Sequence, residues 1–299
     1  MMFPTWQNFF KDKLNDGKFN AELVPPKFSA TKDFWPPKFP GYIDNSQHPF
    51  TYCDALYDKG DAEKTKWCLG ESPSQFESNK QKMPPDWKYR TKEVEYKVNS
   101  SGYRTKEWND IDWKNSVVIF GDSCTFGSGL AEDETISSVL EGRLNRPVIN
   151  MGVPGGSNQL ILNNCATLIE KFGVPHGVVI NWTTTDRFRY YFKNGYHDVG
   201  PWDDIEKEKI DGVNITDLWA KTYMDRYNEL CSAFYISKIA KSMWEGRTKY
   251  ITISYFDYVS HYTRADKFFK IINTARDLLH PGYENSLEVA EYLKCKLQE

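Results

Sequence analysis

The sequence predicts an α/β protein in which a parallel sheet has helices on both faces. Short apolar runs recur between residues 111 and 299 and are bounded by glycine or polar residues, as strands buried on both faces require. Amphipathic segments of helical period lie between these runs. Because consecutive parallel strands need a crossover over one face of the sheet, this alternation predicts a parallel sheet covered by helices.

Four apolar runs are predicted as strands, and three amphipathic segments as helices. The strands are expected at residues 116–120, 147–153, 176–182 and 249–256. The helices are expected at residues 133–144, 157–173 and 286–297. The helix at 157–173 has Ser157 or Asn158 as its N-cap and Gly173 as its stop signal.

The section from residue 183 to about 246 is rich in aromatic residues, and we expect it to be mostly helical. Its stretch "DRFRYYFKNGY", residues 186–196, combines aromatic and basic side chains. Two interpretations remain open for this stretch. It either shapes a substrate pocket at a strand end or forms a helix face packed on the core.

Residues 1–110 differ from the remainder of the chain. Ten of the 15 prolines and six of the 10 tryptophans precede residue 114, in clusters such as "FWPPKFP". Proline breaks helices and favours extended or turn geometry. We therefore predict an irregular N-terminal extension at 1–110 and an α/β domain at 111–299. The aromatic side chains of the extension either pack it onto another surface or form a polysaccharide-binding face.

Composition argues against several classes of function. The net charge of −3 argues against a nucleic-acid-binding surface. No stretch approaches the roughly 18 apolar residues of a membrane-spanning helix, and no secretory signal is evident. The six cysteines lack metal-site spacing, and no dinucleotide or phosphate-loop motif occurs, so we expect no metal and no cofactor. These features predict a cytoplasmic protein, or a virion component if the chain comes from a phage.

Three polar blocks mark the positions where chemistry is expected. "GDS" at 121–123 follows the first strand, "NMGVPGG" at 150–156 ends the second, and Asp277 and His280 precede the last helix. A carboxylate three residues before a histidine can orient its ring and leave the other nitrogen free to act as a base. Ligands of parallel sheets bind at the carboxyl ends of the strands, where these blocks lie.

In this order, the three blocks resemble those of the SGNH (GDSL-type) serine hydrolases. The resemblance covers roughly residues 115–297 and implies a three-layer α/β/α, flavodoxin-like fold and hydrolysis of esters, often acetyl esters of carbohydrates or acyl esters of lipids. Matched residue by residue, it implies Ser123 as the nucleophile, His280 as the base and Asp277 as its orienting partner. It also implies that the backbone N–H groups of Ser123 and Gly152 belong to the oxyanion hole, where each donor contributes on the order of 10²–10³ in rate.

The sequence departs from the family at the third block, where Gly-x-Asn-Asp usually follows the third strand. Here "NWTTTDR" occupies residues 181–187. Thr183 falls at the position of the asparagine that completes the oxyanion hole, and Asn181 is the alternative donor. Arg187 is expected to line the pocket.

The neighbours of Ser123 are given structural roles, Asp122 as a turn-shaping residue and Cys124 as a buried thiol. Two functions follow for the whole chain. The first is a serine esterase or deacetylase acting on a small-molecule or glycan ester. The alternative is a weak or inactive subunit that keeps this fold and assembles, as a homo-oligomer or on a phage particle, through its N-terminal region. A nucleotide-binding or flavin-binding protein is disfavoured because no phosphate loop is present.

Overall fold

The computed structural model describes residues 64–68, 71–192, 195–200, 209–210, 213–214 and 226–299. All of them belong to one compact unit of the chain. The proline and tryptophan clusters before residue 64, including "FWPPKFP", lie outside the described residues.

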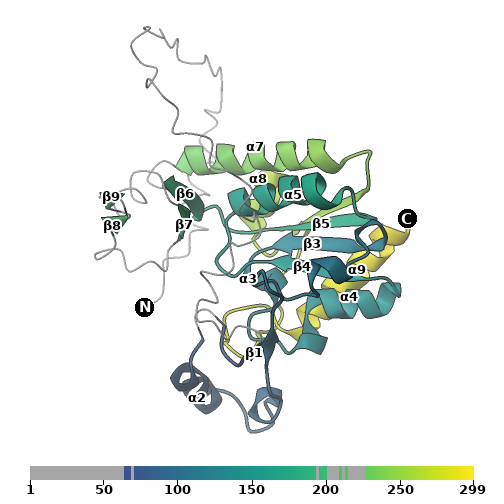
Figure 1. The fold of residues 1–299 in the computed structure, drawn as a ribbon. Coiled ribbons are helices and arrows are strands. Elements are labelled where there is room, and N and C mark those ends of the chain that lie inside the picture. Colours follow the sequence, from purple (N-terminus) through teal and green to yellow (C-terminus); the bar gives the residue numbers. More distant parts are fainter. Residues whose placement is uncertain (1–63, 69–70, 193–194, 201–208, 211–212, 215–225) are drawn as a thin grey trace, which may run out of the picture. The chain divides into compact units, whose positions relative to one another are not determined.

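The central sheet has five parallel strands in the order β4, β3, β5, β10, β11 (Figure 1). Their bounds are Val148–Gly152, Val117–Gly121, Gly177–Trp182, Lys249–Ser254 and Lys267–Phe268. Numbered along the chain, this order is 2-1-3-4-5, which is that of flavodoxin-like sheets. The predicted parallel α/β fold is thus confirmed.

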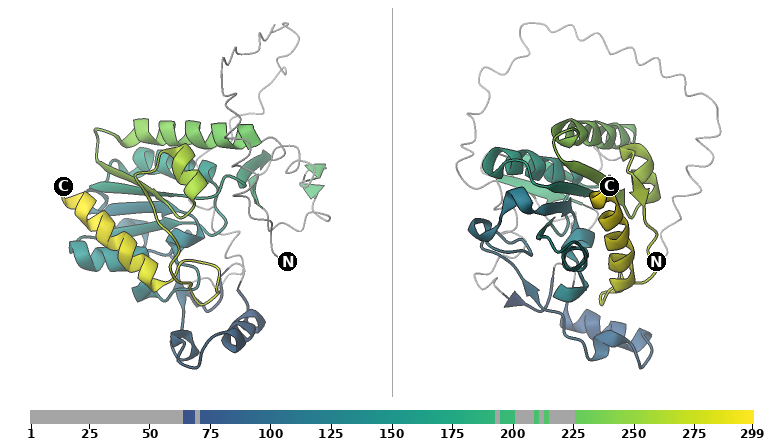
Figure 2. Two further views of the ribbon diagram at one scale, coloured as in Figure 1. Left: turned by 180° about the vertical axis from the view of Figure 1, so that it is seen from behind. Right: turned by 90° about the vertical axis from the view of Figure 1, so that its right-hand side faces the viewer.

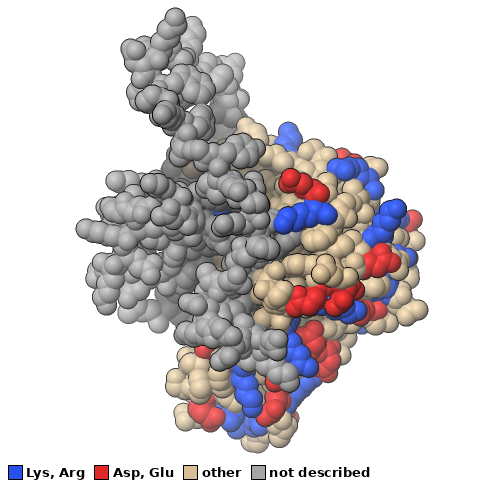
Figure 3. Space-filling view, in the orientation of Figure 1, with Lys and Arg blue, Asp and Glu red and all other residues tan. Residues whose placement is uncertain are grey.

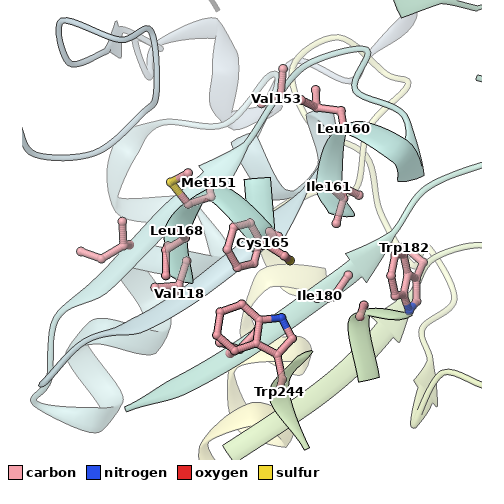
Figure 4. Close-up of a cluster of buried hydrophobic side chains, with 14 of the residues drawn as sticks. Val118, Met151, Val153, Leu160, Ile161, Cys165, Leu168, Ile180, Trp182 and Trp244 are labelled. Atoms are coloured by element: carbon pink, nitrogen blue, oxygen red, sulfur yellow. The ribbon is translucent and has the colours of Figure 1, made fainter. Parts of the chain in front are cut away.

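The strands are apolar on both faces because each face is covered by helices. In β3, Val118 and Phe120 belong to one buried cluster, whereas Val117 and Ile119 belong to the other. This alternation follows from the two-residue period of a strand. Figure 4 shows the first cluster, in which Val118 of β3 lies near Leu168 of a covering helix, and Ile180 and Trp244 belong to the same cluster.

Two helical layers enclose the sheet (Figures 1 and 2). The first cluster includes residues of α5 (Asn158–Phe172), α7 (Arg226–Trp244) and α8 (Asp257–Thr263). The second includes residues of α4 (Ile136–Leu144) and α9 (Tyr283–Gln298). The predicted cap is present, since the Ser157 hydroxyl accepts a hydrogen bond from the Leu160 N–H at 3.2 Å.

The prediction for residues 183–246 is only partly correct. α7 is helical, but β6 (Phe188–Phe192) and β7 (Gly195–Val199) form an antiparallel hairpin, and β8 (Lys209–Ile210) pairs with β9 (Val213–Asn214). The helix-face interpretation of "DRFRYYFKNGY" is therefore wrong, because aromatic residues at successive positions suit an extended strand. The two-residue edge strand β11 was also not predicted, since so short a strand has no detectable period.

The part of the extension that the structure describes contains a helix that the sequence analysis missed. α2 (Pro73–Lys82) follows the N-cap Ser72, and β1 (Lys64–Thr65) pairs with β2 (Tyr96–Lys97). We call residues 64–68 and 71–98 the N-terminal arm. Its buried side chains form a third apolar cluster with residues of the α/β region, namely Phe126, Leu130, Ala131 and Ala275.

Figure 3 shows acidic and basic side chains interspersed over the described surface of this face. Of the helices that are described, none is both long enough and apolar enough to cross a bilayer.

Candidate active site

The turn after β3 presents Ser123 as the first residue of the short helix α3 (Ser123–Phe126). The Asp122 side chain caps this helix by accepting the Cys124 N–H at 2.9 Å. Gly121 is required for the turn, because a Cβ at this position would lie 2.0 Å from the Thr125 hydroxyl oxygen. The sharp exit from the strand places Ser123 at the carboxyl edge of the sheet, and only 7% of its surface is exposed.

Asp277 and His280 lie on the loop that precedes α9. Asp277 Oδ1 accepts the backbone N–H groups of Leu279 and His280 at 3.0 and 3.1 Å, and Asp277 Oδ2 is hydrogen-bonded to His280 Nδ1. Leu278 between them has a φ of 60°. This left-handed conformation is uncommon for leucine and folds the loop back on the carboxylate.

The structure brings the three predicted residues into one chain of hydrogen bonds. His280 Nε2 lies 2.7 Å from Ser123 Oγ, while its Nδ1 contacts the Asp277 carboxylate. The side chains of His280 and Asp277 are 23% and 4% exposed. This arrangement can orient the imidazole and remove a proton from the serine hydroxyl.

Burial and hydrogen bonding oppose each other in setting the protonation of this pair. Burial lowers the pKa of His280, but the hydrogen bond and negative charge of Asp277 outweigh it, so the pKa of His280 lies above its ordinary value. Burial raises the pKa of Asp277, but its bonds from the His280 ring and from the Leu279 and His280 N–H groups leave that pKa below its ordinary value. Asp277 is therefore the ionised partner.

The backbone around Ser123 offers N–H groups that differ in availability. Within the described residues, the Ser123 N–H makes no hydrogen bond. The Gly152 N–H, which the sequence analysis assigned to the oxyanion hole, instead donates to Asn150 Oδ1 at 2.9 Å. The Gly155 N–H in the same loop has no partner in the described part of the chain. The Gly152 N–H can therefore act in an oxyanion hole only if it gives up its hydrogen bond to Asn150 and donates to the substrate instead.

Gly152 has a clear steric role whatever its N–H does. A Cβ here would lie 2.3 Å from the Phe126 nitrogen and 2.8 Å from the Phe126 Cα. These are backbone atoms of α3, which cannot move aside as a flexible side chain would. Glycine at 152 thus allows the end of β4 to approach the helix that carries Ser123.

The third block contacts Asp122 rather than Ser123. Thr183 Oγ1 donates to Asp122 Oδ2 at 2.6 Å, and Arg187 Nη1 donates to the same oxygen at 2.9 Å. Asn181, the alternative donor, bonds to Thr125 Oγ1 at 3.1 Å. Both predicted candidates for a third oxyanion donor are thus engaged within the protein.

Asp122 has a larger role than the turn-shaping one that the sequence suggested. Its buried carboxylate joins the turn after β3 to the segment after β5, because it binds the Cys124 N–H, the Thr183 hydroxyl and the Arg187 guanidinium. Asn158 supports this contact by bonding the Thr183 carbonyl and N–H, both at 3.0 Å. In the sequence, only the position of this charged residue in an otherwise apolar turn pointed to such a role. Its partners could not be identified, because they lie 61 and 65 positions away along the chain.

A pocket lies beside this cluster. Its wall includes Arg187, and the other lining residues are mostly polar: Asn158, Gln159, Thr185, Asn228, Glu229 and Ser232, with Phe188, Ala233 and Ile236. Arg187 and Phe188 of β6 line this pocket, whereas Ser123 and His280 do not. That Arg187 and "DRFRYYFKNGY" shape the substrate pocket therefore stays a prediction.

Cys124 is a second potentially reactive group, since it follows Ser123 in the chain. Burial, together with the charge of Asp122, raises the pKa of the Cys124 thiol well above its usual value, so little thiolate forms there. Among the described residues, no group of three or more His, Cys, Asp or Glu side chains is arranged to hold a metal ion.

No protein-family model and no curated protein matches this sequence. Solved structures do match, although each is similar only at low identity. One is a candidate lipolytic protein of the G-D-S-L family from Desulfitobacterium hafniense DCB-2, which is 15% identical with a TM-score of 0.33 over 61% of this chain and 99% of that chain. Another is an acetyl xylan esterase from the rumen bacterium Butyrivibrio proteoclasticus, at 13% identity and a TM-score of 0.37 over 63% of this chain and 64% of that one.

The SGNH-hydrolase family esterase AlinE4 is 15% identical with a TM-score of 0.29, over 63% of this chain and 75% of its own. The fold assignment rests on the chain's own topology. With a 2-1-3-4-5 parallel sheet and a Gly-Asp-Ser turn at the end of the first strand, the chain has an SGNH-like α/β/α fold.

Proposed function

We propose that this protein is a serine ester hydrolase in which Ser123, His280 and Asp277 are the catalytic residues. The single observation that carries the proposal is the 2.7 Å separation of His280 Nε2 and Ser123 Oγ. It is supported by the contact of His280 Nδ1 with Asp277. A nucleophile hydrogen-bonded to a base, which is in turn hydrogen-bonded to an orienting carboxylate, is the arrangement that serine hydrolysis requires.

In the proposed reaction, Ser123 Oγ attacks the ester carbonyl carbon while its proton passes to His280 Nε2. Asp277 remains ionised and accepts the hydrogen bond from the Nδ1–H of the imidazolium. The tetrahedral intermediate then collapses, the alcohol leaves with the proton from His280, and an acyl-Ser123 ester remains. Water repeats the sequence, with His280 as its base, and releases the carboxylic acid and free Ser123.

The carbonyl oxygen becomes negatively charged in the intermediate and needs donors that are already in place. The Ser123 N–H is the best-supported donor, since it makes no other hydrogen bond in the described residues. A second donor comes from the end of β4 or from the loop that follows it. It is either the Gly152 N–H, after release of Asn150, or the Gly155 N–H, which makes no hydrogen bond in the described residues. Each such donor contributes on the order of 10²–10³ in rate.

The substrate class we propose is an ester of a small acyl group with a polar alcohol, of which an acetylated carbohydrate is an example. The pocket at Arg187 supports this, because most of its lining is amide, hydroxyl or charged and suits hydroxyl groups better than an alkyl chain. Arg187 connects the pocket to the site through its 2.9 Å bond to Asp122, the neighbour of Ser123.

The test uses p-nitrophenyl acetate to follow turnover and a fluorophosphonate probe to label the nucleophile. We expect hydrolysis and labelling in the wild-type protein, and loss of both in Ser123→Ala and His280→Ala. Labelling that persists in a folded Ser123→Ala protein contradicts the assignment of the nucleophile.

A second function is favoured by one specific observation. The Gly152 N–H and the Thr183 hydroxyl are both engaged by protein groups, as expected if the site no longer stabilises an oxyanion. In that case the protein is a binding or assembly subunit with an inactive SGNH-like fold. A folded wild-type protein that neither hydrolyses the acetate nor reacts with the probe supports this alternative.

A further inference from the structure

The residue before Asp277 is held by the N-terminal arm. Arg276 Nε and Nη2 each donate to the Glu71 carboxylate at 3.0 Å, which is the two-point geometry of a strong arginine–carboxylate pair. Arg276 Nη2 also donates to the Lys66 carbonyl at 2.6 Å. The guanidinium lies 4.6 Å from the centre of the Trp67 ring. These partners all come from residues 64–71, far in sequence from the loop that they hold.

A tyrosine connects this ion pair to the nucleophile side of the site. Tyr96 OH donates to Glu71 Oε2 at 2.6 Å and accepts the Gly129 N–H at 2.8 Å. Gly129 follows α3, and its carbonyl accepts the Arg276 N–H at 3.0 Å. Arm, nucleophile segment and His280 loop are therefore joined in one closed set of hydrogen bonds.

The contact between the two catalytic segments leaves little space for movement. A Cβ on Gly129 would lie 3.2 Å from the Asp277 Cγ and 3.0 Å from the Arg276 nitrogen. The arm adds a further bond from α2, in which Asn79 Nδ2 donates to the Arg276 carbonyl at 3.3 Å. A shift of Arg276 would consequently displace Asp277 directly.

The Glu71–Arg276 pair is buried, with side chains 4% and 5% exposed. Burying two charges removes their hydration, so such a pair contributes little net stability compared with apolar residues of the same size. Its effect on the position of the loop is larger than its effect on stability, because loss of Glu71 would leave the charge of Arg276 uncompensated next to Asp277. The placement of this costly pair beside the catalytic loop indicates a positioning role.

We propose that Glu71 and Arg276 are positioning residues that hold Asp277 and His280 in register with Ser123, so that the N-terminal arm completes the active site. This inference rests on the proposed esterase function. It assigns a role to the N-terminal arm, residues 64–68 and 71–98, which lies outside the part of the sequence that resembles SGNH hydrolases. A displacement of about 1 Å in a catalytic group can cost on the order of 10² in rate.

The test compares Glu71→Gln with Glu134→Gln. Glu134 is a matched control because its carboxylate is also buried, at 3% exposed, and also pairs with arm residues, Lys88 and Lys92. We expect Glu71→Gln to lower kcat for p-nitrophenyl acetate on the order of 10²-fold. KM should change by less than about three-fold, because misalignment of the catalytic groups slows the reaction without weakening substrate binding. Its labelling rate should also reach half-maximum at a lower pH, since a weaker Asp277 contact raises the pKa of His280 less. Glu134→Gln should show neither change.

Equal effects of the two variants, or an unchanged kcat and pH midpoint in Glu71→Gln, would overturn the inference. If Glu71→Gln does not fold, Tyr96→Phe is measured in its place, because it removes only the hydroxyl that bridges Glu71 and Gly129.

A proton NMR spectrum separates this inference from the proposed function. The His280 Nδ1–H bonded to Asp277 should give a far-downfield resonance that is lost in Glu71→Gln and kept in Glu134→Gln, even if the wild-type protein neither hydrolyses esters nor labels. Failure of labelling in the wild type counts against the proposed function. Retention of this resonance in Glu71→Gln counts against the positioning role.

Discussion

His280 Nε2 lies 2.7 Å from Ser123 Oγ although 157 positions separate the two residues in the sequence. The contact arises because β3 delivers Ser123 to the carboxyl edge of the sheet, where the loop before α9 also lies. The same loop holds Asp277 against the other ring nitrogen. An ordinary turn would not require a buried carboxylate, an imidazole and a serine hydroxyl to align in this way.

The pH dependence of labelling should report the pKa of His280, which must be neutral to accept the serine proton. Asp277 holds that pKa above its ordinary value despite burial. The rate of fluorophosphonate labelling is therefore expected to rise with pH, with a midpoint above the roughly 6.5 of an unperturbed histidine. This midpoint is measured from labelling rates at pH values between about 5 and 9, with each reaction quenched at a series of times.

Asp277→Asn should move this midpoint to lower pH, because burial still lowers the pKa of His280 while the raising effect of the carboxylate is removed. The maximal rate should also fall, on the order of 10⁴-fold, since the ring loses its orienting partner. A midpoint that is the same in Asp277→Asn and the wild type would show that Asp277 does not act on His280.

The Thr183 hydroxyl should act through Asp122. Thr183→Val removes the donor at 2.6 Å and leaves a buried carboxylate oxygen with Arg187 alone, at an expected cost of about 1–3 kcal/mol of stability. Thr183→Ser keeps the hydroxyl and should retain most of the stability that Thr183→Val loses. Urea unfolding of Thr183→Val, Asp122→Asn and the double variant should give a coupling energy of about 0.5–3 kcal/mol. Additive effects would mean that the two side chains do not interact.

Cys124, the neighbour of Ser123, should be dispensable for the chemistry. Its thiol is buried, and its pKa is well above the usual value, so the reactive thiolate is scarce. Cys124→Ala should hydrolyse p-nitrophenyl acetate within about three-fold of the wild-type rate, and iodoacetamide should not inactivate the native protein. Inactivation of the wild-type protein by iodoacetamide that is absent in Cys124→Ala would contradict this assignment.

Gly152→Ala should disturb the nucleophile segment. The added Cβ would meet backbone atoms of Phe126 at 2.3 Å and 2.8 Å, so β4 or α3 has to move. We expect a loss of about 1–3 kcal/mol of stability, as for other overpacked sites, and slower labelling of Ser123. Gly142→Ala is the matched control, because nothing lies within 4 Å of its Cβ and α4 should gain about 0.5–1 kcal/mol. Equal stability of the two variants would refute the close approach.

The sequence was sufficient to predict the sheet and the contact between Asp277 and His280, because both depend on local patterns. Val117–Gly121 is an uninterrupted apolar run, Gly177–Trp182 is apolar except for Asn181, and the Asp277–His280 spacing lies within one loop. Lys267–Phe268 was missed because a two-residue strand has no period. The hairpin at 188–199 was missed because its aromatic residues also suit a buried helix face, and only pairing across the hairpin decides between them.

The remaining site features depend on contacts between distant segments. Asp122 gains its role from Thr183 and Arg187, and Arg276 gains its role from Glu71, 205 positions away. Neither pair has a spacing that a single sequence reveals. The hydrogen bond from the Gly152 N–H to Asn150 is also not evident from the sequence, because it depends on a side-chain rotamer at the end of β4.

The most direct test of the account is the site at which a fluorophosphonate attaches. Wild-type protein is labelled near the pH of maximal rate, digested, and analysed by tandem mass spectrometry. The account predicts one phosphonyl group on Ser123, and its absence when Ser123→Ala or His280→Ala is treated in the same way. A phosphonyl group on any other residue, or a folded wild-type protein that remains unlabelled, would contradict it.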